Sequence, residues 1–442
     1  MTLTLIAIFV GGYVCVALEH KLRVDKSAIA LLMFGAIWTV YACCSPVGVS
    51  ELVEHLGATC ETLVFLIGAM TIVEIIDSYG GFVFITERIT TRSKWLLLWV
   101  LAIITFFLSA ILDNMTTTII LIMMLRRIVP DSRDRLFYAS VIVIAANCGG
   151  AWSPIGDVST IMLWMRGNVT AAKLVLLLFV PCAISLLVPT WYLSLQFDKH
   201  EALGASATVS QRPSGVERRF SLLVLVLGVF GLLFVPVFKS FTGLPPYVGV
   251  MISLGVLWVL TEVLCDRKHA LPEDSKHRVS KLVRRIDIPV VLFLLGILMS
   301  VAGLQSAGIL SDVAYLLDTY VHEVFVISGI VGLFSSVIDN VSLVAACIGM
   351  YPVSDLATTI PVGVDPVYAQ AFVQDGIFWL LLAYCAGVGG SMLIIGSAAG
   401  VVAMGLEKIN FSWYLKHISP AMLAGYLSGM FVIFLEWWLF LS

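Results

Sequence analysis

Residues 109–114 read SAILDN, and residues 335–340 read SSVIDN. Both stretches lie inside long apolar segments, so an Asp-Asn step is expected within the membrane once in each half of the chain. An ionised Asp is costly in hydrocarbon, and it therefore usually belongs to a functional site. An acidic step repeated in this way indicates a duplicated ion site near the middle of the bilayer.

The composition sets the class of protein. Of the 442 residues, 60% are hydrophobic and 12% are charged, whereas soluble domains are about half apolar and about one quarter charged. We expect an all-α polytopic membrane protein whose surroundings are the lipid bilayer. Nothing in the sequence indicates an enzyme, a resident cofactor or a nucleic-acid partner.

Apolar runs of spanning length predict the transmembrane helices. They lie near 2–18, 27–43, 60–78, 136–166, 172–196, 219–238, 247–264, 287–304, 373–408 and 418–441. Two further segments, 95–125 and 321–350, contain the Asp-Asn steps. The distribution of Lys and Arg decides whether these two segments cross the membrane.

Basic clusters lie on both sides of segment 95–125, whereas 305–320 and 351–372, which flank the second segment, contain no Lys or Arg. If each segment is a re-entrant hairpin, 23 of the 26 Lys and Arg residues fall in cytoplasmic loops, as the positive-inside rule requires. Both termini are then external. The charge bias favours the inner membrane of a bacterium, with a eukaryotic organelle left open.

The two halves therefore predict an inverted repeat of about five spans each, with one re-entrant helical hairpin and one broken helix per half. The first repeat covers 1–197, with its hairpin at about 95–125 and its broken helix at about 136–166. A polar cytoplasmic linker, 198–218, leads to the second repeat. That repeat covers 219–442, with a hairpin at about 321–350 and a broken helix at about 373–408.

The broken helices are predicted from two matched stretches. Residues 147–156 read NCGGAWSPIG, and residues 387–396 read GVGGSMLIIG. Gly-Gly pairs also occur where membrane helices simply pack closely. Here, however, Gly, Asn, Pro and Ser gather in the middle of one long apolar segment per half, which favours unwound backbone beside a site.

A cation in lipid needs oxygen ligands and some negative charge, and Na⁺ suits carboxylate, amide, hydroxyl and carbonyl oxygens. The residues that offer these groups at the predicted hairpin tips and helix breaks are Asp113, Asn114, Thr117, Asn147, Asp157, Asp339, Asn340, Ser342 and Ser391. Additional candidates are Glu74, Ser109, Ser153, Ser335 and Ser397. Asp113, Asp157 and Asp339 are the acids expected to hold Na⁺. The position in the second half that corresponds to Asp157 is occupied by Ser397, which has no charge, so the duplication is imperfect.

Proton transfer through the core must also depend on carboxylates, because all seven histidines fall in loops or at span ends. A buried carboxyl group can exchange a proton near neutral or alkaline pH. Competition of a metal cation and a proton for the same acids is the simplest physical basis for their exchange by alternating access.

At these residues the sequence resembles the NhaD-type sodium/proton antiporters of the ion transporter superfamily. The most specific part is LDNMTTT at 112–118 combined with ANCGGAWSPIGD at 146–157, completed by IDN at 338–340 and GGS at 389–391. The resemblance implies inverted repeats, hairpin tips that meet broken helices at the membrane midplane, a homodimer with an elevator-like moving domain, and exchange of Na⁺ or Li⁺ for H⁺. It implies essential roles for Asp113, Asn114, Asn147, Asp157, Asp339 and Asn340.

Two other functions stay open at this point. A sodium-coupled dicarboxylate symporter of the same superfamily would have neutral hairpin tips, whereas both tips here carry Asp and we expect no Lys or Arg in the core. An intramembrane aspartyl protease would use paired Asp residues, yet residues 154–157 read PIGD rather than a Gly-x-Gly-Asp pattern. Proteolysis would also leave the duplication unexplained.

Overall fold

The protein is described by a computed structural model that covers residues 1–17, 22, 24–45, 48–82, 91, 93–197, 215–267, 286–321, 323–351, 353 and 366–440. All 19 elements within these ranges are helices, and seven of them are long and apolar enough to cross a membrane. The chain is therefore an all-helical polytopic membrane protein. Most of the predicted linker, 198–214, and the basic loop 268–285 lie outside the described residues.

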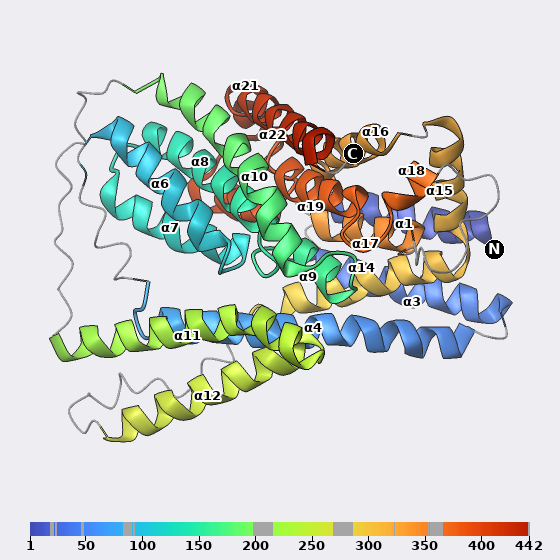
Figure 1. The fold of residues 1–442 in the computed structure, drawn as a ribbon, viewed down its shortest axis with the longest axis horizontal. Helices are drawn as coiled ribbons and strands as arrows, with labels where there is room; N and C mark the ends of the chain where they lie inside the picture. The colour runs from blue at the N-terminus through green and yellow to red at the C-terminus, as the bar shows by residue number, and fades with distance from the viewer. Residues whose placement is uncertain are drawn as a thin grey trace.

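The helices follow one another in two comparable series (Figure 1). The first series is α1 (Thr2–Ala17), α3 (Lys26–Cys44), α4 (Gly48–Ser78), α6 (Lys94–Ser109), α7 (Asn114–Ile128), α8 (Ser132–Ala151), α9 (Val158–Met165) and α10 (Ala171–Ser194). The second series is α11 (Gly215–Thr242), α12 (Pro246–Arg267), α14 (Ile288–Ser306), α15 (Ile309–Tyr320), α16 (Val324–Ser335), α17 (Asn340–Met350), α18 (Pro366–Gln370), α19 (Ile377–Gly389), α20 (Ala398–Glu407), α21 (Phe411–His417) and α22 (Ser419–Phe440).

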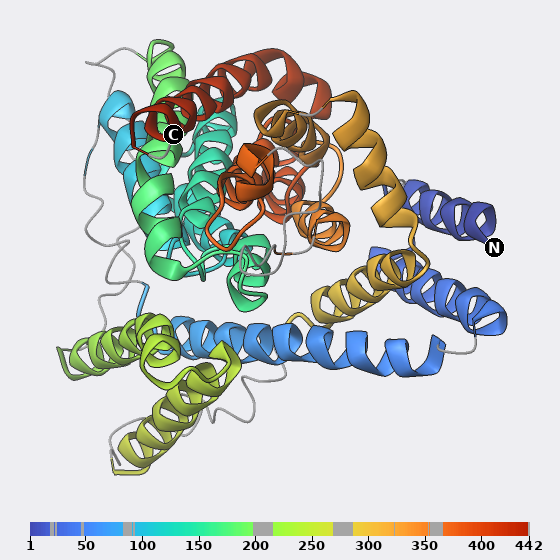
Figure 2. The same ribbon diagram turned by 45° about the vertical axis from the view of Figure 1, so that its right-hand side comes forward.

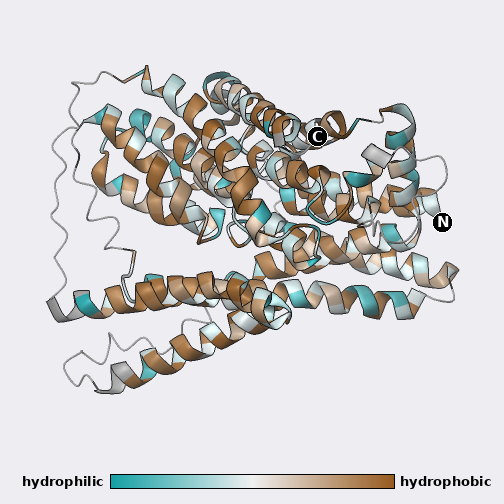
Figure 3. Ribbon diagram, viewed as in Figure 1, coloured by the Kyte–Doolittle hydropathy of each residue, from teal (hydrophilic) through white to brown (hydrophobic). Residues whose placement is uncertain are grey.

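Helices dominate because a chain in lipid must satisfy its backbone hydrogen bonds internally. Figure 3 shows apolar residues along most of the helical length. The largest departure from expectation is α4, which begins at Gly48 rather than near residue 60. Residues 48–59 include Glu51, Glu54 and His55. These side chains lower the hydropathy of the segment but do not oppose helix formation.

Each segment with an Asp-Asn step consists of two short helices joined by a turn. Helices α6 and α7 have 16 and 15 residues, and α16 and α17 have 12 and 11, whereas a crossing needs about 20. The long apolar segments that follow are also interrupted. The first breaks at 152–157 between α8 and α9, and the second breaks at 390–397 between α19 and α20.

Equivalent helices of the two series pack in matching ways. Helix α6 packs on α8, and α16 packs on α19. Helix α7 contacts α20 of the other series, just as α17 contacts α9. Helix α3 packs along α14, and α12 packs along α4. In both ribbon views α11 and α12 lie beside α4, away from α6, α8 and α10 (Figures 1 and 2).

The same hydrogen bond fixes the end of α6 and the end of α16. The Ser109 hydroxyl donates to the Ala146 carbonyl oxygen at 2.6 Å, and the Ser335 hydroxyl donates to the Ala386 carbonyl oxygen at 2.7 Å. Close backbone approach accompanies these bonds, because a Cβ atom on Gly149 would collide with the carbonyl of Phe106. The turn after each short helix is thereby held against the broken helix beside it.

Candidate functional site

Asp157 is the centre of a buried cluster of polar side chains. Asn114 Nδ2 donates to Asp157 Oδ2 at 3.0 Å, and Asn340 Nδ2 donates to the same oxygen at 2.8 Å. The backbone N–H of Ser159 donates to Oδ1 at 3.0 Å, because Asp157 is the N-cap of α9. Donors from α7, α9 and α17 thus hold one carboxyl group, whose residue is only 2% exposed.

Asn147 connects this cluster to the second broken helix. Its Oδ1 accepts from Asn114 Nδ2 at 3.0 Å, and its Nδ2 donates to the hydroxyl oxygens of Ser391 and Ser397, both at 2.8 Å. Asn147 lies in α8, and both serines lie in the break between α19 and α20. The structure therefore brings six of the candidate residues, from both halves of the chain, into one hydrogen-bonded network.

Asp113 and Asp339 match in sequence but differ in their surroundings. Asp113 caps α7, since its Oδ1 accepts from the Thr116 N–H at 2.8 Å and its Oδ2 accepts from the Thr116 hydroxyl at 2.6 Å. Asp339 precedes α17 without a side-chain capping bond. Its Oδ2 is enclosed and has no hydrogen-bond partner among the described residues. Of the two acids in the Asp-Asn steps, Asp339 is thus the one with an enclosed oxygen available to a ligand.

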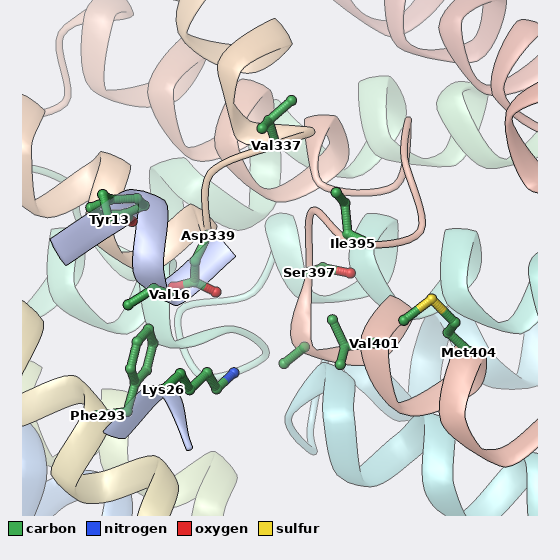
Figure 4. Close-up of a pocket in the computed structure, with 11 residues that line it drawn as sticks. Tyr13, Val16, Lys26, Phe293, Val337, Asp339, Ile395, Ser397, Val401 and Met404 are labelled. Atoms are coloured by element: carbon green, nitrogen blue, oxygen red, sulfur yellow. The ribbon is translucent and has the colours of Figure 1, made fainter. Parts of the chain in front are cut away.

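Several hydroxyl groups are enclosed in the same manner. Tyr13 Oη, Ser342 Oγ and Thr117 Oγ1 have no hydrogen-bond partner within the described ranges. Tyr13 comes from α1 and lines a cavity of about 130 Å³ together with Asp339 (Figure 4). A buried polar group without a partner is costly. Tyr13, Ser342 and Asp339 therefore offer enclosed oxygens to an ion or a water molecule.

A second cavity, of about 310 Å³, reaches both Asp157 and Asp339. Asp25, which is exposed, and Asp287 also line this cavity, and they are the N-caps of α3 and α14. Both helix starts are expected on the cytoplasmic side. The cavity therefore leads from the buried acids toward the predicted cytoplasmic face.

Asp25 contributes a fixed negative charge at this end of the cavity. Hydrogen bonds from Ser27 hold the pKa of the Asp25 carboxyl below its ordinary value, and one of them is the Ser27 N–H bond to Oδ1 at 2.7 Å. An acid that stays ionised beside a cavity raises the local concentration of cations.

The expectation of a core without Lys or Arg is wrong at one position. Lys26 lines both cavities, and its ammonium nitrogen lies 4.8 Å from the centre of the Phe293 ring. Lys26 is the first residue of α3, so the sequence alone places it among the cytoplasmic basic residues. A long lysine side chain can nevertheless extend along apolar surface from a helix end, and Figure 4 shows it extended beside Phe293.

The remaining candidates lie outside the hydrogen-bonded cluster. Ser109 and Ser335 bond to backbone carbonyls, and the Ser153 hydroxyl donates to the Ala110 carbonyl. Glu74 lies on α4 and accepts a hydrogen bond from the Ser78 hydroxyl at 3.2 Å. These side chains support the backbone of the site or lie away from it.

The oxygen chemistry of the site suits a hard cation. Within the described residues no three His, Cys, Asp or Glu side chains converge, whereas the cavity brings the buried carboxyl group of Asp157 and the enclosed oxygen of Asp339 together with the amide groups of Asn114 and Asn340. Such oxygens suit Na⁺ by the same logic as Mg²⁺ and Ca²⁺.

Sequence reasoning missed Tyr13 and Lys26 as parts of this site. Both lie within or next to the first predicted spans, and no motif distinguishes them from ordinary membrane-helix residues. The available signal was weak: a tyrosine inside an apolar run, and a lysine at the start of a span rather than in the middle of a loop.

Comparison with known proteins gives a consistent result. The model of the citrate transporter family matches residues 13–373. The chain is 44% identical over 425 residues to sodium/proton antiporter 2 of Arabidopsis thaliana, covering 95% of this chain and 96% of that protein. It is 42% identical to sodium/proton antiporter 1 of the same plant, with 95% and 70% covered. It is 31% identical to the Na⁺/H⁺ antiporter NhaD of Vibrio cholerae, with 95% and 88% covered.

Proposed function

Because the chain belongs to the NhaD-type sodium/proton antiporters, within the citrate transporter family, we propose that it exchanges Na⁺ or Li⁺ for H⁺ by alternating access. The observation that carries this proposal is the larger cavity. Two acids from the apolar segments, Asp157 before α9 and Asp339 before α17, both line it. The transported ions are substrates, and the protein acts without a resident cofactor.

The chemistry of exchange follows from the limited number of acids. When Na⁺ binds, oxygens of Asp339 and Asp157 supply the charge, and amide groups of Asn114 and Asn340 can turn to present oxygen in place of nitrogen. When protons bind, the same carboxyls are neutral and no longer hold the metal cation. Asp113, which is engaged in capping α7, supports the first hairpin tip and adds negative charge there.

An inverted-repeat architecture is part of the proposal. It is supported by the matched contacts of α6 with α8 and α16 with α19, and by the crossed contacts of α7 with α20 and α17 with α9. The pairs α6–α7 and α16–α17 are the proposed re-entrant hairpins. The repeats are 1–197 and 219–442, and the segments from α8 to α9 and from α19 to α20 are the broken helices.

The orientation and assembly are proposals of the same kind. Both termini are external, the starts of α3 and α14 face the cytoplasm, and two chains form a homodimer. The relatives include plant as well as bacterial proteins, and the plant pair is the more similar. Their identities therefore do not favour a bacterial inner membrane over a eukaryotic organelle.

Citrate transport is the second candidate, because the matching family model is described as a citrate transporter. The lining of the larger cavity argues against it. Four Asp residues and a single basic side chain, Lys26, line that cavity among the described residues. Like charges brought together without compensation cost several kcal/mol, so a substrate with three carboxylates is disfavoured there.

The test uses purified protein in proteoliposomes that contain a pH-sensitive dye and a preset pH gradient. Na⁺, Li⁺, K⁺, succinate and citrate are added in turn to vesicles with wild type, Asp339→Asn or Asp157→Asn. Asp312→Asn, an exposed acid on α15, is the matched control. We expect proton movement on Na⁺ or Li⁺ addition, loss of at least about 100-fold in either cavity variant, and wild-type rates in the control.

Two results would contradict the proposal. Proton movement that survives in both Asp339→Asn and Asp157→Asn would remove these acids from the ion path. Sodium-dependent uptake of citrate or succinate, with no response to Na⁺ alone, would establish a symporter instead.

A further inference from the structure

Lys26 is the one basic side chain that the structure places on the larger cavity within the described residues, against four acids. Two of those acids are engaged at helix starts, since Asp25 accepts from the Ser27 N–H at 2.7 Å and Asp287 accepts from the Val290 N–H at 3.4 Å. Asp157 holds three hydrogen bonds. Asp339 is the one of the four whose enclosed oxygen has no hydrogen-bond partner among the described residues.

The position of the Lys26 side chain relates it to Asp339 in particular. Both residues line the smaller and the larger cavity, and Figure 4 shows the lysine extended into the smaller one below the carboxyl group. The charge of the ammonium group acts on the Asp339 carboxylate. No ion pair joins Lys26 to any described residue, and its ammonium nitrogen lies over the Phe293 ring, 4.8 Å from the ring centre. Space for a cation thus remains beside Asp339.

We propose that Lys26 is an intrinsic cation that competes with Na⁺ for Asp339. This inference rests on the proposed exchange of Na⁺ for H⁺. When the site is empty, the ammonium group approaches Asp339 and balances its negative charge. Without this balance the ionised carboxylate would be costly in the hydrocarbon of the membrane. When Na⁺ enters, the flexible lysine stem moves its ammonium group back over Phe293, because lysine is a mobile point charge that also interacts with aromatic faces.

Competition has a consequence that damage to the protein cannot imitate. If Lys26 occupies the same place as Na⁺, removing its charge tightens Na⁺ binding. A lysine that only stabilises the start of α3 would, on removal, leave Na⁺ affinity unchanged or lower it. The direction of the change in affinity therefore separates a competing cation from a structural side chain.

The experiment measures Na⁺ binding to the purified full-length protein by isothermal titration calorimetry, at one alkaline pH and with choline chloride holding the ionic strength constant. Lys26→Gln and Lys26→Met remove the charge, and Lys26→Arg retains it. Lys416→Gln, an exposed lysine of α21, is the control for net charge. Thermal unfolding midpoints identify any variant that fails to fold.

We expect both neutral variants to bind Na⁺ roughly threefold to tenfold more tightly, with an equal fall in the KM for Na⁺ in proteoliposomes. Lys26→Arg, which keeps the positive charge, and Lys416→Gln, which lies away from the cavity, should stay within about twofold of wild type. Unchanged or weaker Na⁺ binding in the folded neutral variants would overturn this inference while leaving the exchange function intact. A wild-type protein that neither binds nor exchanges Na⁺ would overturn the proposed function, and the competition with it.

Discussion

Asp157 and Ser397 occupy equivalent positions in the two helix breaks, and each caps the helix that follows it. Of these two residues only Asp157 has an ionisable side chain. Of Asp113 and Asp339, only Asp339 has an enclosed oxygen without a hydrogen-bond partner among the described residues. In the proposed exchange, each half of the chain therefore supplies one acid, but from a different element: the first half from the break before α9 and the second half from the turn before α17.

Tyr13 gives a prediction at this scale. Its hydroxyl group is enclosed beside Asp339 without a hydrogen-bond partner among the described residues, so we expect it to take part in holding the cation. Tyr13→Phe should raise the KM for Na⁺ about threefold to tenfold. The unfolding midpoint should not fall, because the variant removes an unsatisfied buried group. Proteoliposome exchange and thermal unfolding measure the two effects.

The matched control for this variant is Tyr414→Phe. The Tyr414 hydroxyl donates to the Ser391 carbonyl oxygen at 2.9 Å, so its loss should lower stability by about 1 kcal/mol. If Tyr13→Phe instead destabilises the protein and leaves the KM unchanged, the Tyr13 hydroxyl is a structural group.

Single residues also show how far the sequence could lead. The sequence could identify Asp157, Asn147 and the two Asp-Asn steps. Polar side chains are few in apolar segments, and those present usually have a function. The inequality of Asp113 and Asp339 could not be found, because it depends on whether a side chain turns back to cap its own helix. Lys26 likewise depends on the direction of a flexible side chain that starts at a span end.

At the scale of elements, hydropathy predicts where most helices lie, and Gly, Ser and Pro predict where the long segments break. The breaks at 152–157 and 390–397 overlap the stretches 147–156 and 387–396, whose composition favours unwound backbone, and each break extends one residue beyond its stretch. The start of α4 is predicted less well. Hydropathy gives no sign that the helix continues through charged residues such as Glu51 and Glu54. Helix propensity and hydropathy are different properties, and only the second was informative here.

The contact between α6 and α8 allows a sharp test. Any Cβ atom on Gly149 would collide with the backbone carbonyl of Phe106, and the same holds for Gly389 and the carbonyl of Gly332. Backbone atoms cannot rotate away, so Gly149→Ala and Gly389→Ala should each destabilise the protein by about 1–3 kcal/mol. Thermal unfolding in detergent measures the effect, and slower ion exchange should accompany it because the hairpin tips shift.

Gly35→Ala is the control for both substitutions. No atom outside its own helix lies within 4 Å of the Cβ position at Gly35, and alanine favours helix more than glycine. Its unfolding midpoint should equal or exceed that of wild type. Equal unfolding midpoints for all three variants would show that the close approach of these helices does not contribute to stability.

At the scale of the whole molecule, one acid at the predicted cytoplasmic side joins the two halves. Glu407 at the end of α20 accepts from Arg126 of α7 at 2.7 Å and from Arg135 of α8 at 2.9 Å. Its side chain is only 3% exposed. Glu407→Gln removes the charge shared by two arginines, and we expect a loss of about 1–3 kcal/mol in stability.

Asp134→Asn is the comparison for this prediction. Asp134 pairs with Lys94 at 2.7 Å within the first half, and its side chain is 15% exposed. Its loss should cost less, because more exposed ion pairs contribute about 0–1 kcal/mol. Thermal unfolding in detergent orders the two variants, and a larger effect in Asp134→Asn would contradict the assigned role of Glu407.

Gly80 and Gly308 both adopt a left-handed backbone, with φ angles of 71° and 75°. They are at matched positions, because the similar stretches LVFLIG at 63–68 and VLFLLG at 291–296 each end 12 residues before them. Together with the paired Ser109 and Ser335 bonds, they resemble what two descendants of a common ancestral gene would inherit. Positions that backbone geometry restricts are alike in the two halves, whereas Asp157 and Ser397 differ. Natural selection would thus have been free to specialise the chemistry of each half while the shared scaffold remained fixed.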